Sequence, residues 1–313
     1  MPRVRACERR TTPDPVLPDR AGGRGFFGRR DEDAATALEW TQGNGKGKDG
    51  SAMGRDRETA LITGATGGIG SELARCFAKD GYDLVLVGRD EEKLAAAAAA
   101  LSDEFAIEAQ ILVQDLAQPD AAAHVAETMR ARNVQVDALV NDAGFGYDAR
   151  FVESDGERQH DLVQVNVAAL TELCHAFAPA MAARGHGAVL NVASVAGFLA
   201  GPGMSTYYAS KAYVQSFTQS LHIELLSSGV HVSALCPAPV RTPFWKNADA
   251  GNTALAHLTL PPKVVARAGY LALRVNKTLC TPGLFAKLIV FSTRLLPRSW
   301  IARIAWLLQY KRR

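Results

Sequence analysis

From Thr59 onward, apolar runs of strand length alternate with segments of helix length. The expected strands lie at 59–63, 83–87, 109–113, 137–141, 187–193 and 230–236, and the expected helices at 69–79, 90–102, 119–131, 158–183 and 206–227. Continuous apolar strands that alternate with helices predict a parallel sheet covered on both faces. We therefore expect an α/β fold with a doubly wound parallel sheet. Residues 58–313 suffice for one such domain and are too few for two.

The first expected strand ends in a glycine-rich turn, TGATGGIG at 63–70, and a helix follows directly. Glycines at this position let the backbone approach a pyrophosphate, which the positive helix N-terminus stabilises. No Lys-Ser or Lys-Thr pair follows the turn, which excludes a nucleoside-triphosphatase loop. The turn therefore predicts a dinucleotide cofactor, with contacts from Thr63, Gly64, Gly68, Ile69 and Gly70.

The tip of the second strand indicates which dinucleotide binds. An acidic residue there would bind the ribose of NAD, but Gly88 occupies the position and Arg89 comes next. An arginine pairs well with a 2′-phosphate, so the sequence favours NADP(H), with NAD(H) as the alternative. Arg89 and Asp90 could instead form a solvated turn.

Tyr207 and Lys211 lie one helical turn apart, and Ser194 precedes Tyr207 by thirteen residues. Reducing a ketone needs a hydride from a nicotinamide and a proton from a nearby acid. A free tyrosine has a pKa of about 10, and we expect the charge of Lys211 to lower it. Tyr208 lacks this spacing, because Ala212 stands four residues after it.

Together with Asn141-Asp142-Ala143-Gly144 and Asn166, these motifs resemble the short-chain dehydrogenase/reductase family over residues 63–211. The resemblance implies a Rossmann-like fold and a catalytic set of Asn166, Ser194, Tyr207 and Lys211. Ser194 would hold the substrate carbonyl, and Asn166, in the long helix 158–183, would complete a proton relay. Tyr207 and Lys211 would also bind the cofactor, with Lys211 on the nicotinamide ribose. Further cofactor contacts implied by the resemblance are Asp115 at the adenine, Asn141 and Gly144 at the wall, and Pro237, Val240 and Thr242 near the nicotinamide.

The chain departs from the family pattern where Asp142 replaces an asparagine and Ala238 a glycine. Simpler interpretations also remain, with Ser194 as a cap at the end of a strand and Asn166 as an amide on a helix surface. Two function classes stay open. The first is an NADP(H)-dependent oxidoreductase that interconverts a ketone and a secondary alcohol, and the second is a non-catalytic nucleotide-sensing protein on the same fold. The presence of Ser194 and Tyr207 together favours the enzyme.

Several other classes are excluded. Five scattered cysteines, none in a CxxC pair, argue against a disulfide framework or a zinc site and favour the reducing cytoplasm. The histidines show no metal spacing, so no metal is expected, and no GxSxG elbow supports a hydrolase. The longest uncharged stretch, 185–210, is too rich in glycine and hydroxyl groups to span a membrane.

Both ends of the chain differ from the expected domain at 58–283. Residues 1–57 show no periodicity and predict a solvated arm, with Met53 as a candidate biological start. Residues 58–249 carry 12 basic and 23 acidic side chains, whereas residues 250–313 carry 11 basic side chains and no acidic one. The tail at 284–313 mixes apolar and basic residues, which suits a peripheral membrane contact or an acyl carrier, or packing on the body or between subunits.

The segment 238–260 is the expected substrate loop. It contains Phe244, Trp245, Leu255, Leu258 and Leu260. This lining predicts a hydrophobic small-molecule substrate, of which an acyl or lipid-derived ketone is one example. We expect a homo-oligomer and no nucleic-acid partner, because the charges of the N-terminal arm are mixed and the basic excess lies on the substrate side.

Overall fold

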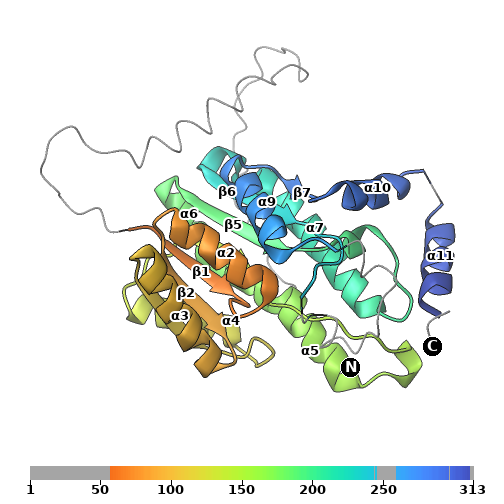
Figure 1. Ribbon diagram of the computed structural model, residues 1–313, viewed down its shortest axis with the longest axis horizontal. Coiled ribbons are helices and arrows are strands. Elements are labelled where there is room, and N and C mark those ends of the chain that lie inside the picture. Colours follow the sequence, from red (N-terminus) through yellow and green to blue (C-terminus); the bar gives the residue numbers. More distant parts are fainter. Residues whose placement is uncertain (1–56, 243, 245–258, 296, 311–313) are drawn as a thin grey trace, which may run out of the picture.

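The computed structural model describes residues 57–242, 244, 259–295 and 297–310. Its centre is a seven-stranded parallel sheet in the order β3-β2-β1-β4-β5-β6-β7 (Figure 1). The strands are β1 (Thr59–Thr63), β2 (Asp83–Gly88), β3 (Ala109–Val113), β4 (Ala138–Asn141), β5 (Gly187–Val192), β6 (Val230–Leu235) and β7 (Leu279–Cys280). This confirms the doubly wound fold and the six expected strands. The two-residue β7 was not expected, because it is too short to show a pattern.

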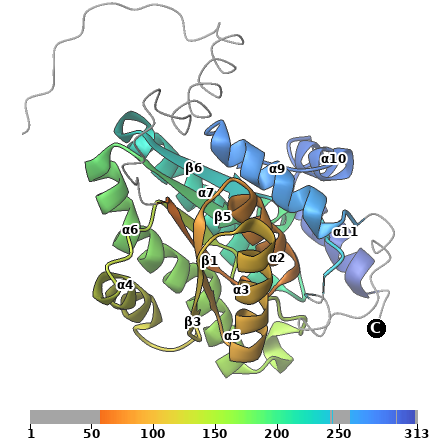
Figure 2. The same ribbon diagram turned by 60° about the vertical axis from the view of Figure 1, so that its left-hand side comes forward.

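Helices cover both faces of the sheet, as continuous apolar strands require. Helices α2 (Gly68–Lys79), α3 (Glu91–Phe105) and α9 (Pro262–Arg274) cover one face, and α4 (Ala121–Ala131), α6 (Leu170–Arg184) and α7 (Ser205–Leu225) cover the other (Figure 2). Successive residues of β1 alternate between the two cores, with Ala60 and Ile62 in one and Leu61 in the other.

The helix expected at 158–183 is present, but it contains an irregular turn that was not expected. A helix α5 (Gly156–Val163) runs into a π-helical turn, η2 (Gln164–Ala169), and α6 continues from it. A π turn holds one more residue than an α turn and occurs mostly at functional sites. Asn166 lies in this turn, so the segment that carries it is not regular helix.

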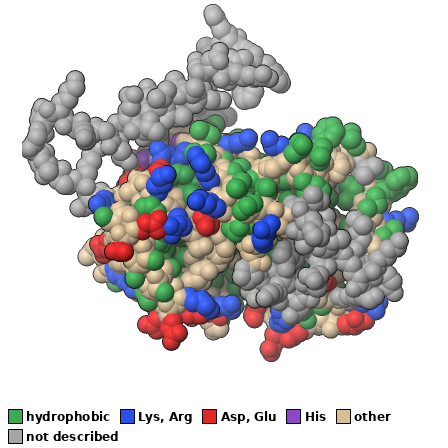
Figure 3. All heavy atoms as spheres, viewed as in Figure 1, with side chains coloured by type: hydrophobic (Ala, Val, Ile, Leu, Met, Phe, Trp, Pro, Cys, Tyr) green, Lys and Arg blue, Asp and Glu red, His purple; other side chains and the backbone are tan. Residues whose placement is uncertain are grey.

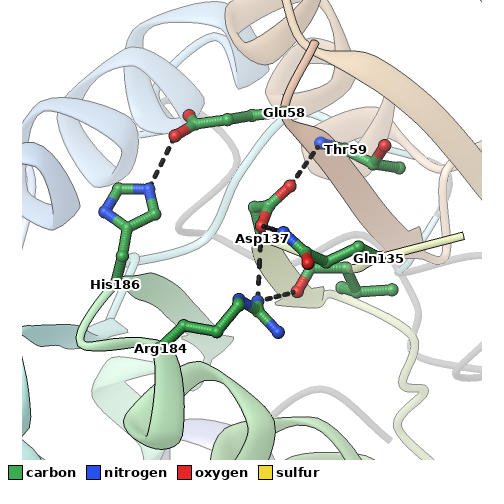
Figure 4. Close-up of polar contacts among 7 residues, drawn as sticks. Glu58, Thr59, Gln135, Asp137, Arg184 and His186 are labelled. Atoms are coloured by element: carbon green, nitrogen blue, oxygen red, sulfur yellow. Dashed lines mark hydrogen bonds and ion pairs between the residues drawn. The ribbon is translucent and has the colours of Figure 1, made fainter. Parts of the chain in front are cut away.

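The amino ends of three strands are tied together by a cluster of polar side chains (Figure 4). Asp137, just before β4, accepts a hydrogen bond from Thr59 N at 3.0 Å and pairs with Arg184 at 3.3 Å. Glu58, just before β1, contacts His186 Nε2 at 2.6 Å. These contacts fix the strand starts at the edge opposite the carboxyl ends.

The C-terminal segment forms two helices. They are α10 (Leu284–Ser292) and α11 (Arg298–Tyr310), and Pro297 stands directly before α11. None of the helices within the described ranges is long and apolar enough to cross a membrane. The arm with Met53, and Trp245, Leu255 and Leu258 of the substrate loop, lie outside the described residues.

Candidate active site

The candidate site lies at the carboxyl edge of the sheet, where the strand order reverses between β1 and β4. Thr63 ends β1, Asn141 ends β4, Ser194 follows β5 and Pro237 follows β6. In an open α/β sheet, ligands bind in the crevice outside this edge. The topology therefore brings together four segments that are far apart in the sequence.

The glycine turn is shaped by close packing that only glycine permits. Gly64 has φ +68°, and a Cβ there would lie 2.8 Å from Ala143 N. A Cβ on Gly68 would lie 2.4 Å from Thr242 Cγ2, so Thr242 sits against the turn as expected for a cofactor-side residue. Gly67 has no side chain that could cap α2, and Asp142 lies against Gly70, so the N–H groups of Gly68 and Ile69 remain for a ligand. An open helix N-terminus behind a glycine cradle fits a dinucleotide pyrophosphate.

Two residues predicted to contact the cofactor also have structural partners here. Thr63 Oγ1 accepts a hydrogen bond from Ala143 N at 3.1 Å, which ties the end of β1 to the loop after β4. Ile69 packs against the core under α2. Their side chains therefore shape the turn.

Asp142 places a buried carboxyl group under the glycine turn. It lies so close to Gly70 that a Cβ on Gly70 would be 2.6 Å from Asp142 Oδ2. Burial raises the pKa of Asp142 to about 7, although the charge of Lys211 and the backbone N–H of Gly70 act in the opposite direction. The acid is therefore an ionisable group next to the expected cofactor phosphates.

Tyr207, Ser194 and Lys211 meet at the start of α7. Tyr207 is 8% exposed, and its phenol lies near the side chain of Ser194, which acts to lower the pKa of Tyr207. Ser194 Oγ accepts a hydrogen bond from Ala196 N at 3.1 Å, so Ser194 is also a capping residue. Lys211 Nζ donates to Val192 O at 2.8 Å and lies 6.0 Å from the centroid of the Tyr207 ring.

The pKa of Tyr207 is raised by burial, with the Ser194 side chain acting in the lowering direction. The expectation that the charge of Lys211 lowers the pKa of Tyr207 was wrong for this structure. The physical reason is that the Lys211 ammonium group is bonded to Val192 O while the phenol is removed from water. Burial also lowers the pKa of Lys211 to about 8.

Asn166 is buried at 1% exposure, so it is not an amide on a helix surface. Its Oδ1 accepts from Phe145 N at 3.1 Å, and its Nδ2 donates to Phe145 O and to Ser210 Oγ, both at 3.0 Å. A Cβ on Gly144 would lie 2.9 Å from Asn166 Oδ1 and 3.4 Å from Lys211 Nζ. Gly144 thus lets the backbone pass between these two side chains.

Asn141 is committed to the sheet. Its Nδ2 donates to Asn191 Oδ1 at 2.9 Å, and Asn191 Nδ2 donates to Thr218 Oγ1 at 3.0 Å. These bonds join β4, β5 and α7 just below the site. The structure therefore places Asn141 behind the cofactor wall.

The residues after β2 and β3 are those expected at the adenosine end of the cofactor. Asp90 accepts from Lys93 N at 3.1 Å and caps α3, so its carboxylate already has a partner. Arg89 is exposed and lies 4.0 Å from Asp115, whose Oδ1 accepts from Ala117 N at 3.0 Å. The structure thus brings Arg89 and Asp115 together.

The turn after β6 closes the other end. Pro237 O accepts from Val195 N at 3.0 Å, and the backbone at Val240 pairs with Leu260. These contacts hold Pro237 beside the Ser194 segment and Val240 beside the chain that returns from the substrate loop.

Sequence reasoning missed two polar residues of α7. Ser210 binds Asn166, and Gln215 Nε2 donates to Ser194 O at 2.6 Å. The signal was available, because a stripe of buried polar residues recurs at helical spacing along α7. Its members are Tyr207, Ser210, Lys211, Gln215, Thr218 and His222.

The comparisons with known proteins agree with this geometry. The family model for short chain dehydrogenases matches residues 58–253. The chain belongs to the short-chain dehydrogenase/reductase family. The resemblance expected from the motifs is thereby confirmed.

Three similar proteins illustrate what this short-chain dehydrogenase/reductase resembles within the family. The inactive hydroxysteroid dehydrogenase-like protein 1 of Mus musculus is 31% identical over 74% of this chain and 70% of its own length. A short-chain dehydrogenase from Sphingobium yanoikuyae, solved in complex with NADPH, has 35% identity and a TM-score of 0.69 over 76% of this chain and 93% of its own. The bulky-bulky ketone specific alcohol dehydrogenase from Comamonas testosteroni has 30% identity and a TM-score of 0.64 over the same two shares.

This short-chain dehydrogenase/reductase is an NAD(P)-dependent oxidoreductase of the ketone–alcohol type. The residues present fit a nicotinamide dinucleotide, with the glycine turn and α2 for the pyrophosphate and the Ser194–Tyr207 pair at the other end.

Proposed function

We propose that the enzyme is an NADP(H)-dependent carbonyl reductase for hydrophobic ketones, such as acyl or lipid-derived ones. The observation that carries the proposal is that the side chains of Ser194 and Tyr207 lie next to each other at the carboxyl edge of the sheet. A carbonyl oxygen that accepts from both hydroxyls would lie beside a proton donor and a second hydrogen-bond donor.

Each residue of the proposed catalytic set then has one task. Bound NADPH supplies the hydride. Tyr207 donates its phenolic proton to the forming alkoxide, and its raised pKa keeps it protonated at neutral pH. Ser194 orients the carbonyl oxygen. Lys211 is proposed to hold the nicotinamide ribose, and Asn166 positions the main chain at Phe145 and connects to Ser210 within a proton relay.

The NADP(H) preference rests on charge at the tip of β2. The carboxylate of Asp90 caps α3, so it is a poor partner for a ribose 2′-hydroxyl. Arg89 is exposed beside Asp115 and presents a guanidinium where a 2′-phosphate would lie. The complex of the Sphingobium yanoikuyae protein with NADPH supports the same choice.

The substrate side of Tyr207 is apolar and aromatic. The Tyr207 ring lies 5.5 Å from the Phe244 ring and 6.0 Å from the Tyr208 ring, centroid to centroid. Other members of this cluster are Leu162, Ala196, Met204, Phe145 and Tyr147. Such a wall favours a bulky or long apolar ketone over a charged one, and the similarity to the bulky-bulky ketone specific enzyme supports this.

The alternative is a protein that binds the dinucleotide without turnover, and the mouse relative is named as an inactive protein. The Ser194–Tyr207 pair argues against it, because a nucleotide binder does not need a proton donor held next to a second hydroxyl.

The test is NADPH oxidation measured over ketones of increasing chain length, with wild type and Tyr207→Phe. We expect turnover on apolar ketones that falls at least about 100-fold in Tyr207→Phe, while the dissociation constant for NADPH changes by less than about twofold. Tyr213→Phe is the matched control, because Tyr213 is exposed on the same helix and, in the described contacts, its hydroxyl bonds only the Thr171 hydroxyl. Full activity of Tyr207→Phe would rule out the mechanism, and NADPH binding without turnover of any ketone would favour the alternative.

A further inference from the structure

Helix α10 is fixed to the enzyme beside the candidate site. Its Ala286 is 1% exposed and packs with Val195 and Ala238, which directly follow Ser194 and Pro237. Phe285, Ile289 and Val290 join this small core. One face of α10 therefore belongs to the fold and lies next to the substrate side of the site.

The other face of α10, continued by α11, carries a surface of exposed apolar side chains. Leu284, Leu288, Phe291 and Leu295 follow helical spacing, and so do Trp300, Ile304 and Leu307. These seven residues, which we name the C-terminal surface, are between 46% and 74% exposed. Figure 3 shows apolar side chains gathered over α10 and α11 at the upper right of the molecule. Seven of the 17 large apolar side chains exposed in the described part of the chain thus fall within 24 residues.

The charges around the C-terminal surface are all positive. Lys287 on α10, Arg294 between the two helices and Arg303 on α11 are exposed, and no acidic residue follows Asp249 in the sequence. Basic residues beside exposed aliphatic and tryptophan side chains are typical of helices that lie in the interface of an anionic membrane.

A second copy of the chain fits the C-terminal surface less well. In a two-fold symmetric contact, the same patch meets itself, so the basic groups of both copies would face each other without an acidic residue in either segment. An anionic bilayer provides a hydrocarbon region for the apolar side chains and negatively charged headgroups for the basic ones.

We propose that the C-terminal surface docks the enzyme onto an anionic lipid bilayer, with α10 and α11 lying in the interface and the substrate side of the site turned toward the lipid. Since α10 packs beside the Ser194 and Pro237 segments, a docked enzyme would take an apolar ketone from the membrane without passing it through water. This second consequence rests on the proposed function, whereas the docking itself does not.

The experiment is co-sedimentation of the full chain with vesicles of phosphatidylcholine alone or mixed with phosphatidylglycerol. We expect binding to the anionic vesicles that weakens as the salt rises from about 0.1 to about 0.5 M, because exposed charges are screened. Replacing Lys287, Arg294 and Arg303 by Gln should lower the vesicle partition coefficient by about 100-fold. The apolar variant Leu288→Ser/Phe291→Ser/Trp300→Ser should lower it at least about tenfold.

The matched control is Ile223→Ser/Leu226→Ser, which removes two apolar side chains of similar exposure near the end of α7. It should bind anionic vesicles as wild type does. A wild-type chain that stays in the supernatant with anionic vesicles at low salt would overturn the proposal. So would C-terminal variants that bind vesicles normally but change the molar mass measured by light scattering, because the surface would then join copies of the chain.

Vesicle binding is measured without turnover, so the two proposals fail separately. If the enzyme binds vesicles but reduces no ketone, the docking stands and the proposed function fails. If Tyr207→Phe abolishes ketone reduction and the wild-type enzyme does not bind vesicles, the proposed function stands and the docking proposal fails.

Discussion

The carboxyl group of Asp142 lies against Gly70, within the first turn of α2, so closely that a Cβ on Gly70 would be 2.6 Å from Asp142 Oδ2. The same turn is where the enzyme is expected to hold the cofactor phosphates. With its pKa raised to about 7, this acid gains its negative charge in the physiological range, next to an anionic ligand.

Asp142→Asn should therefore tighten NADPH binding in a pH-dependent way. Below pH 7 the carboxyl group is protonated and the two proteins should bind alike. Above pH 7 wild type carries a charge that repels the phosphates, which costs about 1 kcal/mol, or about fivefold in affinity. Fluorescence titration with NADPH at pH 6 and pH 9 measures the ratio of the two dissociation constants. A ratio that does not change with pH would contradict this role, and Asp103→Asn, an exposed acid of α3, is the control.

Arg89→Ala should weaken NADPH binding by about tenfold and leave NADH binding within about twofold. The reason is that a guanidinium–phosphate pair contributes about 1.5 kcal/mol or more, and NADH has no 2′-phosphate. Titration of both cofactors against wild type and variant measures this. Equal losses for both cofactors, or a wild type that prefers NADH, would show that Arg89 belongs to a solvated turn.

Asn166→Ala should lower the free energy of unfolding by about 3 kcal/mol, because it removes the three hydrogen bonds of a buried side chain. Ser210→Ala removes one bond to Asn166 and should cost about 1 kcal/mol. Urea denaturation of both variants gives the comparison. Equal small losses would mean that Asn166 does not hold the π turn.

The contact between His186 and Glu58 should make stability pH-dependent. Their hydrogen bond raises the pKa of His186 above 6.5 and lowers the pKa of Glu58 below 4.5. The stabilisation is therefore complete between about pH 4.5 and 6.5, lost as pH rises through the raised pKa of His186, and lost as pH falls through the lowered pKa of Glu58. Both side chains are partly exposed, so we expect at most about 1 kcal/mol. Urea unfolding of wild type and His186→Gln should differ at pH 5.5 and converge at pH 8.5, and a constant difference would contradict the linkage.

The sequence predicted the sheet well because each strand is buried on both faces and reads as a continuous apolar run. It could not predict β7, since Leu279 and Cys280 join the sheet only through contacts with β6. Periodicity also failed at Gln164–Ala169, because a π turn changes the repeat without any marker residue such as proline.

At the site, the Tyr-xxx-Lys spacing located Tyr207 and Lys211 on one face of α7. Their pKa values could not be inferred from spacing, because they depend on how far each group is removed from water. The hydrogen-bond partner of Lys211 in this structure is the backbone oxygen of Val192 on β5. A motif of side chains cannot predict a contact with a backbone atom on another element.

The π turn at Gln164–Ala169 limits which insertions and deletions the enzyme tolerates. Each residue of a helix rotates the chain about the helix axis by about 100°. Deleting one residue of this turn would give a more regular helix, yet it would rotate α6 by that angle relative to α5. Leu162 and Leu173, both fully buried, could then not both face the core. A single-residue deletion there should be more damaging than most substitutions, and a second-site insertion of one residue nearby should restore folding.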